Sequence, residues 1–412
     1  LSHPYPHPSY PTSTPLVEAM EPPCEPLKWT QPLQLPRAGS GEDFLWSQPS
    51  SFQDREVYGH SATVVGNLVW VLGGKNQAGK RISVHTFCPK TLTWSDCTPK
   101  ERRAETPCAR WGHSVCAVPG GLLLLVGGFD SKHNLRDTWC LDTEDGSFNE
   151  VCDDLVVFGA YHSVVFDHTT GRLTLFGGQC CVNGPYEYYN DVQVLHYGSD
   201  DDDLEGWIPV LVKGTAPAPR AQHCAALYGT QMVVYGGANA TRQFNDVWLL
   251  NLQTFIWHEL CCGRLSGSPP PIQTNLCEQH FRVKSCRSIL ALHKMKLLVL
   301  GPGRGSTETA KRYGLYVFDL EQQAWKTAPL VHNNILWRGN AAGWIFKTAE
   351  NEELWIHGGH LGNDTQPRQI VLRLHTGLTS LVRRTVRGIN ALPHENLKLV
   401  FSFLSGSVAD LI

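Results

Sequence analysis

The chain has 412 residues, with 35 lysines and arginines against 38 aspartates and glutamates, and a formal net charge of -3. This near balance gives no electrostatic reason to expect nucleic acid or an anionic membrane as a partner. No run of about 18 apolar residues occurs, and the N-terminus lacks the basic-then-apolar layout of a secretory signal. We therefore expect an intracellular protein, cytoplasmic or nuclear, that binds peptides or proteins.

The chain begins with a segment rich in proline, serine and histidine, residues 1–40. Such a composition is too poor in apolar residues to build a core. We predict that this segment is disordered.

An apolar run that ends in Gly-Gly then recurs along the chain. A sixth copy is degenerate, because LLVLGPG at 297–303 carries Pro302 in place of the second glycine. The copies end at Gly73-Gly74, Gly127-Gly128, Gly177-Gly178, Gly236-Gly237, Gly301 to Gly303 and Gly358-Gly359. A blade of four strands needs about 50 residues, so the spacing predicts an all-β fold, a six-bladed β-propeller over residues 41–375.

The two ends of this region predict how the ring closes. Phe44 to Trp46 precedes the first repeat as an outer strand should, and Gln369 to Leu374 follows the last Gly-Gly as a third strand should. The sixth blade is therefore expected to take one strand from the N-terminal end and three from the C-terminal end, which removes free sheet edges.

Histidines, tryptophans and cysteines of the repeats are expected to be structural. His60, His113, His162 and His223 each stand at the same repeat position, and Trp94, Trp257 and Trp325 fall where a side chain would fill the space between blades. Cys116 and Cys224 lie within apolar strand patterns, where a free thiol behaves as a small hydrophobe. No cysteine pair has C-x-x-C spacing and no phosphate, nucleotide or nucleophile motif is present, so we expect no metal, no cofactor and no catalysis.

Beyond Gly377 the apolar period changes to that of helices. Leu381, Val386 and Ile389 fall on one helical face, and a second short helix starts near Pro393 and carries Leu397 and Leu404. We predict a helical tail over residues 376–412. Its apolar face could dock on another protein or pack under the propeller.

The repeats together resemble the kelch-repeat β-propeller family, and within it kelch domain-containing protein 2 and its close relatives. The likeness is densest over residues 213–260 and covers the layout of blades over residues 44–375. The resemblance implies a substrate receptor of a cullin-2 RING ubiquitin ligase, joined to the ligase through elongins B and C.

In the tail, the segment 380–389 is similar to an elongin-binding box, with Leu381, Thr385 and Ile389 at its positions and threonine where the family has cysteine. Leu392, Pro393 and Leu397 match a cullin-selecting box. The same stretch also looks like the start of an F-box, which would bring a Skp-type adaptor and cullin-1 instead.

The resemblance further implies that the bowl of the propeller grips the C-terminal tails of substrates with arginines, a serine and an aromatic residue. The family's two arginine positions fall on Ala238 and Gln243 in this chain. The residues that could supply the site are Tyr189, Arg242, Ser285, Arg287, Arg304 and Arg338. A kelch scaffold without a ligase, for example a cytoskeletal or vesicle-associated adaptor, is the alternative function.

Overall fold

The computed structural model is built of β-strands, and the residues that it describes contain no helix. The described residues are 46–47, 57–75, 81–91, 93–99, 106–153, 155, 159–180, 185–197, 206–261, 289–293, 296–302, 313–328, 339–347, 352–359 and 371–375. Within them, no helical segment has the length and apolar character needed to cross a membrane. The predicted disordered segment 1–40 and the predicted helical tail 376–412 lie outside the described residues.

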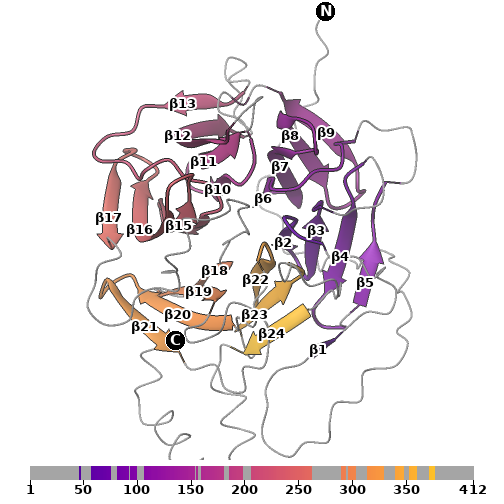
Figure 1. Ribbon diagram of the computed structural model, residues 1–412. Helices are drawn as coiled ribbons and strands as arrows, with labels where there is room; N and C mark the ends of the chain where they lie inside the picture. The colour runs from indigo at the N-terminus through magenta and orange to yellow at the C-terminus, as the bar shows by residue number, and fades with distance from the viewer. Residues whose placement is uncertain are drawn as a thin grey trace, which may run out of the picture.

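The strands form six four-stranded antiparallel sheets arranged around a common axis (Figure 1). We number these sheets as blades in chain order. Blade 1 contains β2 (Ser61–Val65), β3 (Leu68–Leu72), β4 (Val84–Cys88) and β5 (Thr93–Asp96). Blade 2 contains β6 (Ser114–Val118), β7 (Leu122–Phe129), β8 (Asn134–Asp142) and β9 (Phe148–Cys152). Blade 3 contains β10 (Ser163–Asp167), β11 (Arg172–Cys180), β12 (Glu187–His196) and β13 (Ile208–Val210).

The second half of the ring repeats this order. Blade 4 contains β14 (Cys224–Tyr228), β15 (Gln231–Ala238), β16 (Gln243–Asn251) and β17 (Trp257–Cys261). Blade 5 contains β18 (Ile289–His293), β19 (Lys296–Pro302), β20 (Tyr313–Asp319) and β21 (Ala324–Ala328). Blade 6 contains β22 (Ala342–Lys347), β23 (Glu352–His357), β24 (Val371–His375) and β1 (Trp46–Ser47). The predicted all-β propeller is confirmed, with one sheet for each Gly-Gly repeat.

The ring closes through blade 6, as the sequence predicts. The inner strands β2, β6, β10, β14, β18 and β22 are neighbours in this order, and β22 lies next to β2 again. On the outside, β1 pairs with β24, with Trp46 opposite Leu372 and Ser47 opposite Val371. Strands from the two ends of the repeat region thus share one sheet, which joins the last blade to the first part of the chain and closes the ring.

The core lies between the blades and not within a single sheet. Each blade presents apolar side chains on both faces, because it is packed between two neighbours, and burial of such side chains stabilises the fold by roughly 1.5–3 kcal/mol each. Between blades 1 and 6, Trp94 packs with Phe87 and with Trp344 and Trp355. Trp257 and Trp325 take part in the matching clusters on either side of blade 4, which confirms the predicted role of these tryptophans.

The Gly-Gly pairs and the repeat histidines form one recurring joint between blades. Both glycines of the pairs in blades 1, 2, 3, 4 and 6 have positive φ, for example 66° at Gly177 and 111° at Gly178. A Cβ on Gly177 would come within 2.9 Å of Cε1 of His223 in the next blade, and a Cβ on Gly358 within 2.6 Å of Cε1 of His60. Glycine is therefore required where the histidine of the following blade lies against the strand end.

Blade 5 shows what the loss of the second glycine does. In blades 2, 3 and 4 the register between the second and third strands shifts at the Gly-Gly pair. In blade 5 the pairing of β19 with β20 runs through Gly301 and Pro302 without a shift. Proline cannot adopt positive φ, so the bulge of the other blades is not formed there.

The repeat histidines and strand cysteines are buried, as predicted. His60, His113, His162 and His223 are at most 3% exposed. Cys224 is buried and Cys116 partly so, and burial raises the pKa of the Cys116 thiol to about 12. These positions are structural, because the thiol stays protonated and the rings lie in joints between blades.

Candidate functional site

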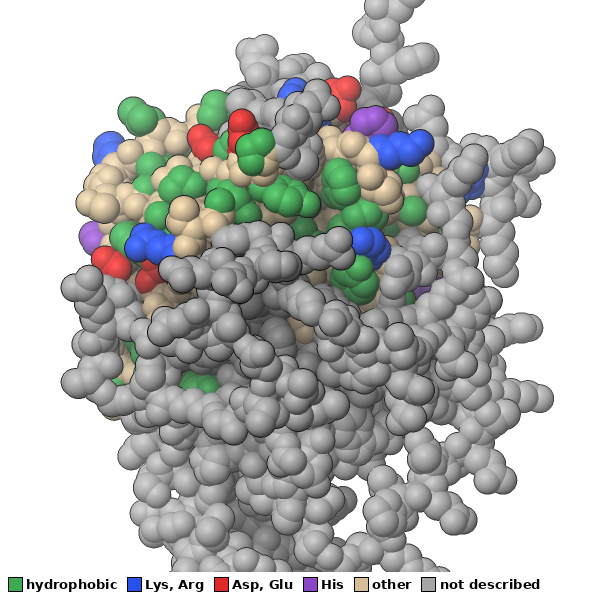
Figure 2. Space-filling model, in the orientation of Figure 1, with side chains coloured by type: hydrophobic (Ala, Val, Ile, Leu, Met, Phe, Trp, Pro, Cys, Tyr) green, Lys and Arg blue, Asp and Glu red, His purple; other side chains and the backbone are tan. Residues whose placement is uncertain are grey.

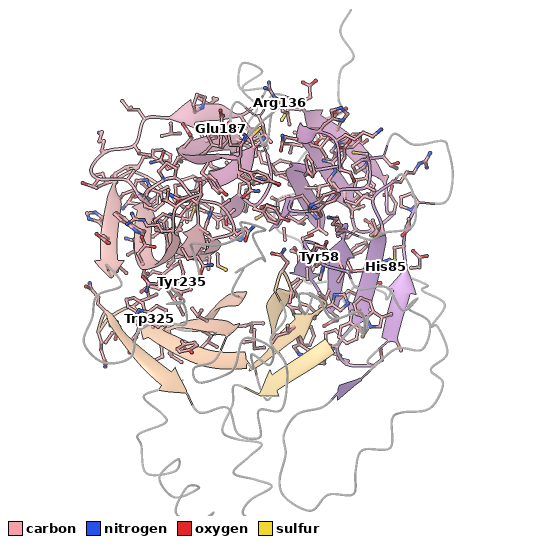
Figure 3. The ribbon with its side chains drawn as sticks, in the orientation of Figure 1. Tyr58, His85, Arg136, Glu187, Tyr235 and Trp325 are labelled. Atoms are coloured by element: carbon pink, nitrogen blue, oxygen red, sulfur yellow. The ribbon has the colours of Figure 1, made fainter. Side chains whose placement is uncertain are left out.

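The loops of each blade divide between two faces of the propeller. The turn between the second and third strands and the segment that leads into the next inner strand lie at the same end of each antiparallel sheet. We call this end the upper face. In Figure 3, Tyr58, which precedes the inner strand β2, lies near the centre of the ring, whereas His85 and Trp325 lie farther out.

A chain of backbone hydrogen bonds surrounds the axis on the upper face. It links the residues at the entry to successive inner strands: the amide of Gly59 donates to the carbonyl of Asn340, Gly112 to Gly59, Tyr161 to Gly112 and Gln222 to Tyr161, at 2.6 to 3.1 Å. These five residues, which we call the entry ring, all have positive φ, between 54° and 68°. The entry ring links blades 6, 1, 2, 3 and 4 to one another at the upper end of the propeller axis, which we call the axial mouth.

Two amide side chains of the entry ring have buried oxygens. Gln222 is 6% exposed and Asn340 is 3% exposed, and neither Oε1 of Gln222 nor Oδ1 of Asn340 has a hydrogen-bond partner in the described part of the chain. A buried acceptor without a partner costs about 1–3 kcal/mol. Blades 1 and 2 have glycine at this position, so the backbone geometry alone does not require either side chain.

A lysine lies over two aromatic rings at the junction of blades 1 and 2. The ammonium of Lys75 is 5.8 Å from the ring centroid of Tyr58 and 5.2 Å from that of Trp111. Lys75 is exposed, and within the described residues it has no carboxylate partner. Its backbone pairs with Tyr58, and the Trp111 ring is held edge-to-face by Phe129 at 5.1 Å. We call Lys75, Tyr58 and Trp111 the lysine shelf.

Arg242 forms a similar arrangement in blade 4. Its guanidinium lies 4.8 Å from the ring centroid of Phe244, and the side chain is exposed without a carboxylate partner among the described residues. The turn that carries it is fixed by Asn239, whose Oδ1 accepts from the amides of Thr241 and Arg242 at 3.0 and 3.1 Å. We call Arg242 and Phe244 the arginine shelf.

Tyr189 lies on the β11–β12 hairpin of blade 3, and its hydroxyl group already makes a hydrogen bond within the protein. Its hydroxyl donates to Oε2 of Glu187 at 3.0 Å. Desolvation and this hydrogen bond raise the pKa of the Tyr189 phenol above its ordinary value, so it stays a neutral donor. In Figure 2, hydrophobic side chains gather where blades 2 and 3 lie, with basic and acidic side chains among them.

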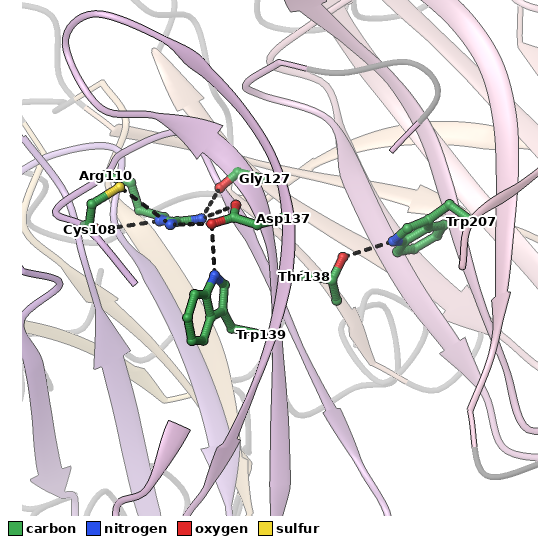
Figure 4. Close-up of polar contacts among 7 residues, drawn as sticks. All are labelled: Cys108, Arg110, Gly127, Asp137, Thr138, Trp139 and Trp207. Atoms are coloured by element: carbon green, nitrogen blue, oxygen red, sulfur yellow. Dashed lines mark hydrogen bonds and ion pairs between the residues drawn. The ribbon is translucent and has the colours of Figure 1, made fainter. Parts of the chain in front are cut away.

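Two other arginines of the upper loops are committed to the fold. Arg110 is 0% exposed; its NH1 and NH2 donate to the two carboxylate oxygens of Asp137 at 2.6 and 2.7 Å, and Trp139 donates to the same carboxylate at 2.7 Å (Figure 4). NH1 of Arg110 also donates to the carbonyl of Gly127. We call Arg110, Asp137 and Trp139 the brace of blade 2.

Blade 4 contains the same brace. Arg220 donates to both oxygens of Asp246 at 2.6 and 2.9 Å, and Trp248 donates to Asp246 at 2.8 Å. The signal for it is present in the sequence: arginine stands three residues before the repeat histidine in these two blades, and Asp-x-Trp follows on the third strand. Because their own aspartates hold them, Arg110 and Arg220 are not available to a carboxylate ligand.

Most of the site residues predicted from sequence are not placed. Ser285, Arg287, Arg304 and Arg338 lie outside the described residues, as do Leu381, Thr385, Ile389, Leu392, Pro393 and Leu397 of the tail. Arg242 and Tyr189 are both on the upper face, in blades 4 and 3. Lys75, Tyr58 and Trp111 were not predicted as site residues, although the aromatic residues flank the repeat histidines.

Among the described residues, no group of three histidine, cysteine or acidic side chains could hold a metal ion. The spacing of His357 and His360 could suggest a metal pair, but Nδ1 of His357 lies 3.0 Å from Nε2 of His60. His360 is outside the described residues. The His60–His357 contact joins blade 6 to blade 1, so both histidines have a structural role.

Comparison with known proteins identifies the repeat. The sequence model of the KLHDC2/KLHL20/DRC7 Kelch-repeats domain matches residues 42–156 and 157–280, more than half of the chain. The chain belongs to the kelch-repeat family. Propellers of this family are generally not enzymes.

Several curated proteins are similar to the propeller. Kelch domain-containing protein 3 of Rattus norvegicus is 28% identical over 49% of this chain and 53% of its own length. The dynein alpha chain of the flagellar outer arm of Chlamydomonas reinhardtii is 24% identical over 73% of this chain but only 6% of its own length. An F-box/kelch-repeat protein of Arabidopsis thaliana is 26% identical over 51% of this chain and 46% of its own. The chain thus spans about half or less of these relatives.

Proposed function

We propose that this chain is a non-catalytic substrate receptor. Its kelch propeller binds a peptide segment of a substrate protein on the upper face, and its C-terminal segment docks a cullin-RING ubiquitin ligase. The proposal places the protein in the cytoplasm or nucleus, with no nucleic acid, membrane or cofactor among its partners.

The lysine shelf and the arginine shelf support the proposal that the upper face binds a substrate. Buried cations in this fold are neutralised, as Arg110 and Arg220 are by their aspartates. Lys75 and Arg242 instead present a charge over an aromatic ring, and neither has an anionic partner among the described residues. A cation held in place before binding loses less side-chain entropy when a ligand arrives, so such positions favour recognition.

The docking half is supported by the sequence of the tail. Leu381, Thr385 and Ile389 match an elongin-binding box, and Leu392, Pro393 and Leu397 match a cullin-selecting box. These residues would recruit elongins B and C with cullin-2. A helical face with apolar residues at three-to-four spacing is the pattern of a segment that lies in a partner's groove.

A second adaptor has its own support. The printed name of the Arabidopsis relative joins an F-box to kelch repeats, and residues 392–404 look like the start of an F-box. In that case a Skp-type adaptor and cullin-1 would replace elongin and cullin-2. The similarity to a dynein chain over 73% of this chain is with a protein of a different kind, and this supports the alternative of a scaffold without a ligase.

Co-precipitation tests the docking half. The intact chain is expected to recover elongins B and C with cullin-2, and the double variant Leu381→Ala/Leu397→Ala is expected to lose them. Leu211→Ala, at a side chain 91% exposed on the propeller, is the matched control and should behave as the intact chain. Recovery of a Skp-type adaptor by the intact chain would select the F-box alternative, and equal recovery from all three proteins would exclude the ligase role.

A further inference from the structure

The two shelves lie on opposite sides of the axial mouth. Lys75 follows β3 of blade 1 and Arg242 precedes β16 of blade 4, so both belong to turns between second and third strands and share the upper face. Six inner strands form the ring, and blades 1 and 4 are three steps apart in it. The two cations therefore lie in turns on opposite sides of the axis.

Both shelves are rigid by the same means. The Lys75 backbone amide donates to the carbonyl of Tyr58 at 2.9 Å, and Trp111 exchanges backbone hydrogen bonds with Phe129 at 3.0 Å. In blade 4 the ring of Phe244 is 5% exposed and lies between two guanidiniums, with buried Arg220 at 4.0 Å and exposed Arg242 at 4.8 Å. Each outer cation thus rests on a ring that the core already holds.

The acidic groups near these shelves are used elsewhere. Asp130 accepts from the amides of Lys132 and His133 in its own turn, and Glu187 accepts from Tyr189. Asp137 and Asp246 are held by the braces of blades 2 and 4. Within the described upper face, no carboxylate neutralises Lys75 or Arg242. Their two positive charges are therefore available to an anionic partner.

We propose that the upper face selects an acidic internal peptide segment, which crosses the axial mouth and places one carboxylate on each shelf. The proposal rests on the proposed function, since it names the substrate class of the same face. A single chain-terminal carboxylate could engage one shelf at a time. Two side-chain carboxylates on an extended segment engage both, and the aromatic rings contact the methylene groups beside each carboxylate.

Fluorescence anisotropy with peptides blocked at both ends tests this inference. The probe is a labelled glycine-serine peptide that carries two glutamates separated by about three, five or seven residues, because an extended chain advances about 3.3 Å per residue. Matched peptides carry glutamine or lysine instead of glutamate. One glutamate spacing is expected to bind most tightly, and added salt should weaken it.

Substitutions of Lys75 and Arg242 measure how much each of the two charges contributes to peptide binding. Lys75→Gln and Arg242→Gln are each expected to weaken binding about threefold and the double variant about tenfold, the range of single solvent-exposed ion pairs. Lys75→Arg should retain binding. The control is Lys90→Gln, which removes an exposed lysine from the turn between β4 and β5 on the opposite face.

The outcomes separate this inference from the proposed function. Equal affinity for glutamate and glutamine peptides, or equal losses from Lys90→Gln and Lys75→Gln, would overturn the acidic selectivity while leaving peptide binding intact. Tighter binding of a peptide with a free C-terminus and a single carboxylate would also overturn it. Absence of binding by every peptide would overturn both the inference and the assignment of the upper face as a peptide site.

Discussion

Blades 2 and 3 are neighbours in the ring, yet they secure their upper ends differently. Blade 2 has Arg110 three residues before its histidine, and this arginine holds Asp137 on the third strand. In blade 3, Gly159 stands at the position of Arg110 and Asp191 at the position of Asp137, and Asp191 is exposed. A Cβ on Gly159 would collide with the carbonyl of Gln179, so the backbone occupies the space that an arginine side chain would need.

The comparison teaches that the brace is not what makes a blade. Both blades pair four strands with the same register shift at Gly-Gly, and both contribute a buried histidine to the joint with the preceding blade. The brace is an addition that makes a buried cation tolerable in blades 2 and 4. Blade 3 replaces it with close backbone contact, and Asp191 has no ion pair among the described residues.

The largest expected effect comes from breaking the brace in blade 2. Arg110→Ala should leave the partly buried Asp137 without its cation and lower the free energy of unfolding by about 3–5 kcal/mol. Asp191→Ala, at the position of blade 3 that corresponds to Asp137, should change it by less than about 0.5 kcal/mol. Thermal or denaturant unfolding followed by circular dichroism measures both; equal losses would contradict the distinction between the two blades.

A smaller effect is expected at the joint that the blades share. Gly177→Ala places a Cβ within 2.9 Å of Cε1 of His223 and of the carbonyl of Arg220, and φ at this position is 66°. We expect a loss of about 2–3 kcal/mol, from the collision together with the left-handed backbone. Gly229→Ala is the control, because φ is 56° there but nothing lies within 4 Å of the added Cβ. It should cost about 1 kcal/mol; a control loss as large as that of Gly177→Ala would remove the collision from the explanation.

The smallest effect is expected in the entry ring. Gln222→Gly puts in blade 4 the residue that blade 2 has at Gly112, relieving a positive φ and removing a buried oxygen without a partner. We expect the free energy of unfolding to stay constant or rise by about 1 kcal/mol. The reverse change, Gly112→Gln, should destabilise, since its Cβ meets that of Ala160 at 3.0 Å. A clear loss from Gln222→Gly in the same unfolding measurement would show that the amide already has a structural partner.

Much of the fold could be predicted from the sequence because the repeat is local. Gly-Gly at the end of an apolar run predicts a strand end with positive φ, and this holds at Gly177 and Gly236. Closure through the two ends was predictable from two short strands placed before and after the repeats, although the N-terminal one begins at Trp46 and not at Phe44 among the described residues.

The site was less predictable because its contacts join residues far apart in the sequence. Arg110 and Asp137 are separated by 27 positions and Lys75 and Trp111 by 36, so local sequence patterns do not show that these residues touch. The sequence marks several arginines as possible ligands for a carboxylate, but it cannot show which are neutralised. Burial decides this: Arg110 and Arg220 are enclosed with their aspartates, while Arg242 stays on the surface.

Hydrogen exchange on a complex tests most directly whether the upper face is where a partner binds. Short peptides selected from a display library against the intact chain supply the ligand. Binding should slow amide exchange over residues 57–75, 106–112 and 238–244, which carry the shelves and part of the entry ring. Protection confined to the opposite turns, at residues 89–91, 143–146 and 229–230, would show that partners bind the other end of the propeller.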